Sequence, residues 1–282
     1  MQEDSLTTQY PRTFRVIAVT SGKGGIGKTN IVTNLALSLA RDGRRVLLVD
    51  ADLGLANCDV VMGLTPKKDM RHLLYEDSDI AECLVTGPEG VDLLSGGSGV
   101  MELTQLETAH KWRLLEALDP LSETYDTLLI DTGAGIGPNV RFFAGAAQEV
   151  VVVVGPEPTS LTDAYSTIKV LTNACGLRRV LVCVNSTTDE AAARDVFRQL
   201  HTVSSRFLSV VVEFAGWVPH DNNVELAVMK QEPFLLSYPM SPASQAINAL
   251  AAALLRRAPE ADSCGGFQMF WRDLLATQGG VG

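Results

Sequence analysis

The sequence is poor in cysteine, and none of its cysteines are paired in a spacing typical of metal sites. Five occur in 282 residues, and no two form a C-x-x-C pair: Cys58, Cys83, Cys175, Cys183 and Cys264. An odd, scattered set is typical of reduced thiols in a cytosolic protein, so a metal or iron–sulfur role for them has no support. Because Cys183 stands inside an apolar run, we expect it to pack in a core strand.

Long apolar runs and an excess of positive charge are also missing. No window approaches the ~20 uninterrupted apolar residues of a membrane span. The first residues, MQEDSLTTQYPRTF, are too acidic and polar for a secretory signal, so we expect a cytoplasmic protein. The formal net charge of −10 argues against specific nucleic-acid binding, although a local basic face stays open.

Seven continuous apolar runs alternate with stretches of helical character. The expected strands are VIAVT (16–20), VLLVD (46–50), VDLL (91–94), TLLID (127–131), VVVVV (150–154), VLVCVN (180–185) and VVEFAGWV (211–218). The expected helices are 28–41, 104–118, 138–147, 160–174, 189–205, 222–230 and 241–257. Continuous apolar runs favour a parallel sheet covered on both faces. The sequence therefore predicts an α/β fold with a doubly wound, mostly parallel sheet, whose ligands bind beyond the carboxyl ends of the strands.

The same pattern divides the chain into four segments. We expect a flexible lead at residues 1–13, one α/β domain at 14–257, a Pro-Gly-polar linker at 258–266 and an amphipathic helix with a tail at 267–282.

The stretch SGKGGIGKTN (21–30) lies between an expected strand and an expected helix, which is the context of a phosphate-binding loop. Lys28 is placed to reach the β- and γ-phosphates of a nucleotide, and the Thr29 hydroxyl to bind Mg²⁺. Backbone N–H groups and the helix amino terminus add further attraction for phosphate. We therefore predict that these residues bind the nucleotide: Gly22, Lys23, Gly24, Gly25, Ile26, Gly27, Lys28, Thr29 and Asn30.

Lys23 is a second lysine inside this loop, which reads K-G-G-x-G-K-T. The loop resembles the deviant Walker A motif of the MinD/ParA class of P-loop ATPases, the SIMIBI group. The resemblance implies that Lys23 reaches across an ATP-bound homodimer to the phosphates held by the other subunit. A cation supplied in this way stabilises the charge of phosphoryl transfer, so ATP hydrolysis would be tied to assembly. We expect this hydrolysis to be slow.

Two acidic strand ends match the other nucleotide elements of that class. VLLVDADLGLANCDVVMG resembles switch I, which implies that Asp52 orients the attacking water and belongs to the Mg²⁺ site. For Asp50, a structural role in capping or packing explains the residue as well as a role at the nucleotide does. YDTLLIDTGAGIG resembles Walker B with switch II, which implies that Asp131 holds Mg²⁺ and that backbone near Gly133 and Gly135 senses the γ-phosphate.

Residues after two late strands are candidates for the adenine site. The resemblance to MinD-like proteins implies that Asn185, Pro219 and Asp221 frame the base. For Asp221, an ordinary turn residue stays open.

Details of sequence point to one subfamily. Switch II reads T-G-A-G, and the run E-P-T-S-L-T-D-A-Y covers Glu157 to Tyr165. This combination resembles FlhG/FleN, MinD-like regulators of flagellar number and placement, and implies a flagellar transcriptional activator or an FlhF-like GTPase as partner. The D-Q-A-x-x-L-R segment used on that GTPase is missing from MQEDSLTTQYPRTF, which favours the activator. A division-site ATPase of the MinD type and a DNA-segregation ATPase of the ParA type are the alternatives.

An apolar stripe with helical spacing ends the chain. It consists of Phe267, Phe270, Trp271, Leu274 and Leu275. The stripe resembles the membrane-targeting helix of MinD and FlhG, which implies peripheral contact with the inner face of the cell membrane in the ATP state. Packing on the protein's own surface stays an equal alternative.

Overall fold

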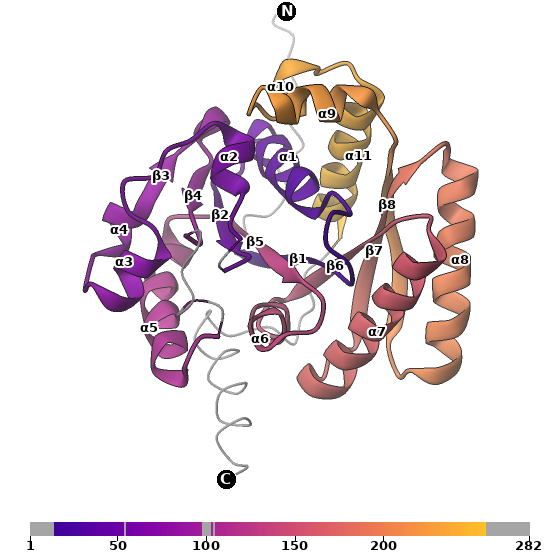
Figure 1. Cartoon of the computed structure of the whole chain (residues 1–282), viewed down its shortest axis with the longest axis horizontal. Helices are drawn as coiled ribbons and strands as arrows, with labels where there is room; N and C mark the ends of the chain where they lie inside the picture. The colour runs from indigo at the N-terminus through magenta and orange to yellow at the C-terminus, as the bar shows by residue number, and fades with distance from the viewer. Residues whose placement is uncertain (1–13, 54, 98–102, 104, 258–282) are drawn as a thin grey trace, which may run out of the picture.

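The computed structural model describes residues 14–53, 55–97, 103 and 105–257, which form one sheet with helices on both faces (Figure 1). The strands are β1 (Arg15–Ser21), β2 (Val46–Ala51), β3 (Leu84–Thr86), β4 (Asp92–Leu94), β5 (Thr127–Ala134), β6 (Glu149–Val154), β7 (Arg179–Thr187) and β8 (Val211–Pro219). The helices are α1 (Lys28–Arg41), α2 (Cys58–Met62), α3 (Met70–Tyr75), α4 (Ile80–Cys83), α5 (Thr108–Leu118), α6 (Pro138–Gly145), α7 (Pro158–Cys175), α8 (Glu190–Phe207), α9 (Asn222–Met229), α10 (Phe234–Ser237) and α11 (Pro242–Arg256).

The sheet contains eight strands in the order β3-β4-β2-β5-β1-β6-β7-β8. Every neighbouring pair is parallel except β3 and β4, which are antiparallel. The predicted doubly wound, mostly parallel α/β fold is confirmed.

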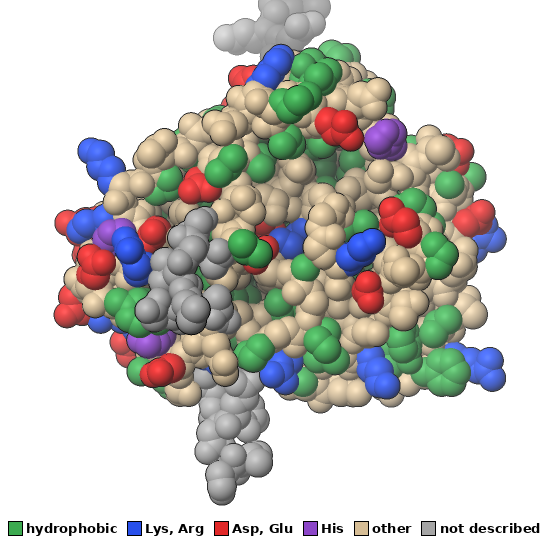
Figure 2. Space-filling view, in the orientation of Figure 1, with side chains coloured by type: hydrophobic (Ala, Val, Ile, Leu, Met, Phe, Trp, Pro, Cys, Tyr) green, Lys and Arg blue, Asp and Glu red, His purple; other side chains and the backbone are tan. Residues whose placement is uncertain are grey.

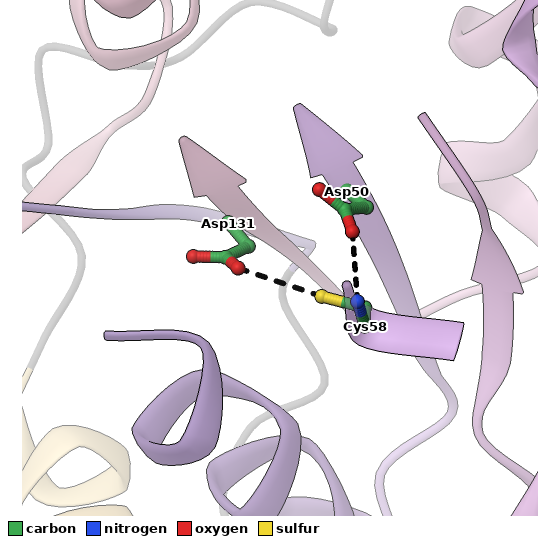
Figure 3. Close-up of side chains that lie close together, drawn as sticks. All are labelled: Asp50, Cys58 and Asp131. Atoms are coloured by element: carbon green, nitrogen blue, oxygen red, sulfur yellow. Dashed lines mark hydrogen bonds between the residues drawn. The ribbon is translucent and has the colours of Figure 1, made fainter. Parts of the chain in front are cut away.

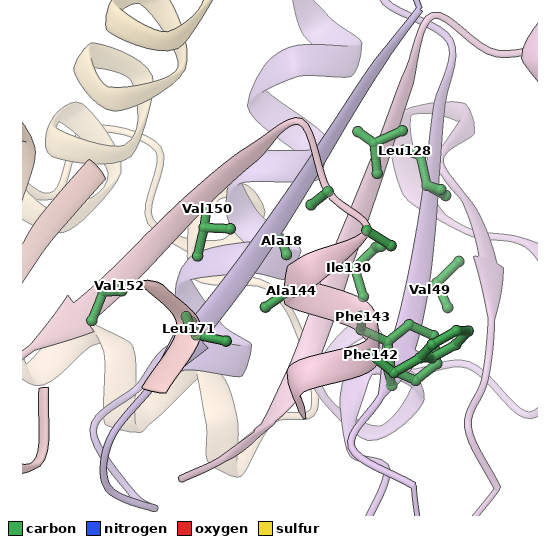
Figure 4. Close-up of a cluster of buried hydrophobic side chains, with 14 of the residues drawn as sticks. Ala18, Val49, Leu128, Ile130, Phe142, Phe143, Ala144, Val150, Val152 and Leu171 are labelled. Carbon is green, nitrogen blue, oxygen red and sulfur yellow. The ribbon is translucent and has the colours of Figure 1, made fainter. Parts of the chain in front are cut away.

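The two faces of the central strands enter two separate hydrophobic cores. On β1, Ile17 and Val19 belong to the core with α1 and α11. Val16 and Ala18 belong to the core with α6 and α7, and Figure 4 shows part of that core around Phe143. Because both faces are covered, the strands are continuous apolar runs, as expected of a parallel sheet.

This topology brings the acidic strand ends together. β1 lies between β5 and β6, and β2 is the other neighbour of β5. In the register of β2 against β5, Asp50 stands opposite Asp131, and Asp131 also pairs with Val19 of β1. The carboxyl ends of β1, β2 and β5 therefore meet at the edge where the glycine-rich loop leaves the sheet.

The differences from the predicted elements concern short segments and helix ends. Helices α2, α3, α4 and α10 and strand β3 were not predicted, because segments of three to six residues carry too little periodicity. The helix predicted at 104–118 begins at Thr108, and the helix predicted at 160–174 begins at Pro158. A proline is tolerated in the first turn of a helix because its missing N–H has no partner there.

Within the described part of the chain, no helix is both long and apolar enough to cross a bilayer. Cys183 is fully buried in β7, as predicted. The predicted lead at 1–13, the linker at 258–266 and the amphipathic helix at 267–282 lie outside the described residues, so they stay predictions.

Candidate nucleotide site

The loop between β1 and α1 requires glycine at two positions for different reasons. Gly27 has a φ of 86°, a left-handed conformation that side chains rarely adopt. A Cβ on Gly22 would lie 2.3 Å from the backbone carbon of Asp163, so only glycine lets the loop pass α7 this closely. Gly27 is also the N-cap of α1, and no side chain caps this helix. The amino terminus of α1 therefore presents backbone N–H groups to a ligand.

Lys28 and Thr29, the first residues of α1, contact the aspartate at the end of β5. The Lys28 ammonium donates to Asp131 Oδ1 at 2.6 Å, and the Thr29 hydroxyl donates to Asp131 Oδ2 at 2.7 Å. Lys28 is 6% exposed and Asp131 1%. Burial lowers the pKa of Lys28, but the charge and hydrogen bond of Asp131 outweigh this effect and raise the pKa overall. The lysine is therefore a buried cation that a carboxylate neutralises.

Asp52 lies beside this pair and is the more accessible acid. Its Oδ2 is 4.0 Å from the Lys28 ammonium, and its side chain is 31% exposed. Its other oxygen would lie 3.1 Å from a Cβ on Gly133, so Asp52 also faces the carboxyl end of β5. Burial raises the pKa of Asp52, the Lys28 charge lowers it, Asp131 raises it, and the net direction is upward. A half-buried carboxylate of this kind can accept hydrogen bonds from water.

Asp50 has a structural role at the same edge. It is fully buried and accepts three backbone N–H groups, from Asp52 at 3.1 Å and from Asn57 and Cys58 at 2.9 Å each. Burial and the neighbouring Asp131 raise the pKa of Asp50, and the three hydrogen bonds oppose them. The sequence left open whether Asp50 acts on the nucleotide or has a structural role by capping or packing. These contacts identify Asp50 as a structural residue that anchors the start of α2.

The second lysine of the loop has the opposite environment from Lys28. Lys23 is exposed, and no ion pair holds its ammonium group within the described ranges. Its carbonyl accepts a hydrogen bond from the Ser21 hydroxyl at 2.9 Å, which helps to hold the loop in shape. The two lysines of the loop therefore differ in burial and in partners.

The predicted adenine residues have other contacts in this structure. Asn185 donates to the Ile26 carbonyl at 2.7 Å, so it braces the loop. Pro219 is the last residue of β8 and pairs with Thr187 of β7. These contacts do not test the predicted role of either residue toward the base.

Asp221 accepts the N–H of Asn223 at 2.9 Å as the N-cap of α9, and the N–H of Ala243 in α11 at 3.1 Å. Burial raises the pKa of Asp221, but these hydrogen bonds outweigh it, so the net direction is downward. The contacts account for Asp221 as a helix cap without any nucleotide.

Gly135 has a φ of 87°, and its N–H donates to the Ser21 carbonyl at 2.8 Å. This N–H therefore links the turn after β5 to the end of β1. The predicted role of Gly135 toward the γ-phosphate stays a prediction.

The sequence did not reveal Cys58 as a neighbour of this site. Its thiol lies 3.5 Å from Asp131 Oδ2, and one ligand atom each from Asp50, Cys58 and Asp131 lie within 4.8 Å of one another (Figure 3). No spacing signal could have shown this contact, because 73 residues separate Cys58 from Asp131.

The oxygen atoms of the site suit Mg²⁺ better than a softer metal. Carboxylate oxygens of Asp52 and Asp131 and the Thr29 hydroxyl are hard ligands of the kind that Mg²⁺ prefers. The Cys58 sulfur is a soft ligand and suits Mg²⁺ poorly. In the space-filling view, acidic and basic side chains lie together near the centre of the face (Figure 2).

A glycine-rich loop between a central strand and a helix, with a lysine paired to the aspartate of a neighbouring strand, defines a P-loop nucleotide-binding protein. The family model described as an AAA domain matches residues 14–177. The chain is 44% identical over 237 residues to the antiactivator FleN of Pseudomonas aeruginosa, which covers 84% of this chain and 85% of that protein. It is 31% identical over 244 residues to the flagellum site-determining protein YlxH of Helicobacter pylori, covering 86% and 82% of the two chains.

Among solved structures, the septum site-determining protein MinD of Pyrococcus horikoshii in complex with Mg-ADP is similar. It superposes with a TM-score of 0.71 at 27% identity and covers 86% of this chain and 96% of that chain. The chain belongs to the FlhG/FleN family of MinD-like P-loop ATPases. This membership confirms the resemblance drawn from the loop and the two switch segments.

Proposed function

We propose that the protein is a switch that dimerises with Mg·ATP, hydrolyses ATP slowly and regulates flagellar number or position by restraining a transcriptional activator. The observation that carries the proposal is the pair of lysines in one loop, with Lys28 buried against Asp131 and Lys23 exposed. Support for the cellular role comes from the relatives, one named as an antiactivator and another as a flagellum site-determining protein.

The first step of the proposed cycle is an exchange of partners at Lys28. In the described structure its charge is neutralised by Asp131. Nucleotide phosphates would take the place of this carboxylate, because the loop N–H groups already direct phosphate to that point. Thr29 and Asp131 would then hold Mg²⁺, with Asp52 close by, and the bound ion would neutralise charge on the phosphates. The Pyrococcus relative is a complex with Mg-ADP, which supports the use of Mg²⁺ together with an adenine nucleotide.

Asp52 is the best-placed acid to orient the attacking water. Asp50 is fully occupied by three backbone N–H groups, and Asp131 would be occupied by Mg²⁺ once the nucleotide binds. Asp52 is partly exposed and faces the carboxyl end of β5. A carboxylate there can hold a water molecule in line with a γ-phosphate, which is the positioning that phosphoryl transfer needs.

The second step is closure by another copy of the chain. Lys23 is exposed and carries a charge that nothing in the described ranges neutralises. Two large apolar side chains on the loops after β2 and β5 are also exposed, Leu55 at 72% and Ile136 at 49%. A second subunit over this edge would bury both and bring its own Lys23 to the phosphates. The site would be complete only in the dimer.

A direct test compares wild type with Asp52→Ala by light scattering in ATP, ADP and EDTA. Wild type should form a dimer with Mg·ATP and return to a monomer as ATP is consumed. Asp52→Ala should dimerise and persist, because the phosphate cradle stays while water orientation is lost. A protein that remains monomeric with Mg·ATP in both forms would contradict the proposed switch.

The same Asp52→Ala dimer serves as bait for the partner. A flagellar transcriptional activator should co-purify with it in ATP and not in ADP. Recovery of a MinC-like division inhibitor, or salt-sensitive binding to non-specific DNA, would instead favour one of the alternative roles.

A further inference from the structure

Cys58 connects the two buried carboxylates of the site. It is the first residue of α2 and is 0% exposed. Its backbone N–H donates to Asp50 Oδ2 at 2.9 Å, and its thiol lies 3.5 Å from Asp131 Oδ2 (Figure 3). The bond to Asp50 fixes the backbone at the start of α2, and this fixed backbone aims the thiol at Asp131.

Three donors hold the Asp131 carboxylate in the described structure. Lys28 donates to Oδ1, and both Thr29 and Cys58 donate to Oδ2. On the function proposed above, Lys28 turns to the phosphates and Thr29 to Mg²⁺ when nucleotide binds. Cys58 is then the one donor of the three that keeps its partner.

The Cys58 thiol is suited to donate a hydrogen bond and not to bind the metal itself. The thiol lies within hydrogen-bond distance of Asp131 Oδ2, at 3.5 Å, and a thiol is a weak hydrogen-bond donor, whereas its soft sulfur is a poor ligand for Mg²⁺.

We propose that Cys58 is a positioning residue for Asp131, whose thiol holds the carboxylate in the orientation that Mg²⁺ requires after Lys28 and Thr29 have changed partners. Groups that donate a hydrogen bond to a metal-binding carboxylate, without contacting the metal, raise metal affinity because the carboxylate is already oriented before the metal binds. The inference rests on the proposed function, since it needs Mg²⁺ at Asp131.

A buried cysteine can also contribute only by filling space in the core, and a second buried cysteine of the chain provides a control for this possibility. Cys183 in β7 is equally buried, and only burial raises the pKa of its thiol, to about 12. Cys183→Ala removes the same atom from a core without touching Asp131. Cys58→Ser keeps a donor at the first site, whereas Cys58→Ala removes it.

The test is a Mg²⁺ titration of the affinity for a fluorescent, non-hydrolysable ATP analogue, with urea unfolding without nucleotide as the check on folding. Cys58→Ala should need about tenfold more Mg²⁺ than wild type for half of the Mg²⁺-dependent rise in nucleotide affinity. Tenfold is the lower end of the range for losing a group that hydrogen-bonds to a metal ligand. Cys58→Ser and Cys183→Ala should titrate like wild type, and affinities in EDTA should be equal. If alanine does not fold at this position, Cys58→Val, which also lacks a donor, replaces it.

Two results would overturn the inference while the proposed function stands. One is a folded Cys58→Ala protein with the Mg²⁺ dependence of wild type, and the other is Cys58→Ser as impaired as Cys58→Ala. Nucleotide binding by wild type that does not depend on Mg²⁺ would overturn the proposed function and this inference with it.

Discussion

Removing the charge of Lys28 should destabilise the protein even when no nucleotide is present. Lys28 is the cation that neutralises Asp131, and the carboxylates of Asp52 and Asp50 lie close to the same point. Lys28→Met keeps the apolar part of the side chain and removes only the ammonium group. The variant would therefore leave buried carboxylates without a counter-charge.

The cost follows from the burial of the pair. Breaking a buried ion pair by removing one partner costs about 3–5 kcal/mol, because the remaining charge is uncompensated. That is a large part of the roughly 5–15 kcal/mol that keeps a typical domain folded. Since the pKa of Lys28 is raised, this stabilisation is complete below the usual lysine pKa of 10.5 and is lost only as the pH rises through the raised value. The whole effect should be present at pH 7.

Urea unfolding without nucleotide measures this cost. With a urea dependence of roughly 3 kcal/mol per M or steeper, the midpoint of Lys28→Met should fall by about 1 M. Lys23→Ala, at the exposed lysine of the same loop, should stay within about 0.5 kcal/mol of wild type. The double variant Lys28→Met/Asp131→Asn should recover most of the loss but still fail to bind ATP. Equal midpoints for Lys28→Met and wild type would refute the reasoning, because the buried pair would then contribute nothing.

Three further predictions concern the loop, a helix cap and the tail. Gly27→Ala should cost about 1–2 kcal/mol from its left-handed backbone and weaken ATP binding, because the new Cβ would lie 2.5 Å from Asn185 Nδ2. Gly43→Ala, with a φ of 81° and open space around it, should show the strain in unfolding and normal ATP affinity, and equal ATP affinity in both variants would contradict the role of the contact. Asp221→Ala should lose about 1–2 kcal/mol of unfolding free energy at pH 7. Because the pKa of Asp221 is lowered, the difference from wild type should shrink as the pH falls below 3.8. A loss of stability that is the same at pH 3 and pH 7 would argue against the cap. Deleting residues 267–282 should leave nucleotide binding intact, and the shortened protein should no longer sediment with anionic vesicles in ATP. Burial of apolar side chains in lipid gains about 25 cal/mol per Å², and a dimer carries two such tails. A truncated protein that sediments like the full chain would show that the tail is not the anchor.

The parts of the fold that sequence could predict are those whose information is local. The helix predicted at 28–41 coincides with α1, because the glycine run ends it on one side and Asp42-Gly43 on the other. The long apolar strands were equally visible, because burial on both faces leaves a continuous run. The short elements α2, α3 and β3 were not visible, because each has too few residues to show a periodicity. Contacts with more distant parts of the chain help to place them, such as the bond from the Met70 N–H at the start of α3 to the Ser95 carbonyl after β4.

The candidate site divides in the same way. The phosphate loop and the acidic strand ends could be found in the sequence, because their residue types and spacing are enough to indicate phosphate and Mg²⁺ binding. The contact of Cys58 with Asp131 and the double cap at Asp221 were not, because each joins segments that only the folded sheet brings together. The hydrogen bond from Asn185 to the Ile26 carbonyl was not predictable for the same reason, and the role of Asn185 toward the base stays a prediction.

Light scattering of Lys23→Ala with Mg·ATP shows whether Lys23 acts across a dimer. ATP affinity should match wild type, because Lys28, Thr29 and the loop N–H groups remain. The variant should stay monomeric where wild type and Lys169→Ala, a control at an exposed lysine of α7, form dimers. A Lys23→Ala protein that dimerises with ATP and hydrolyses it at the rate of wild type would contradict the account.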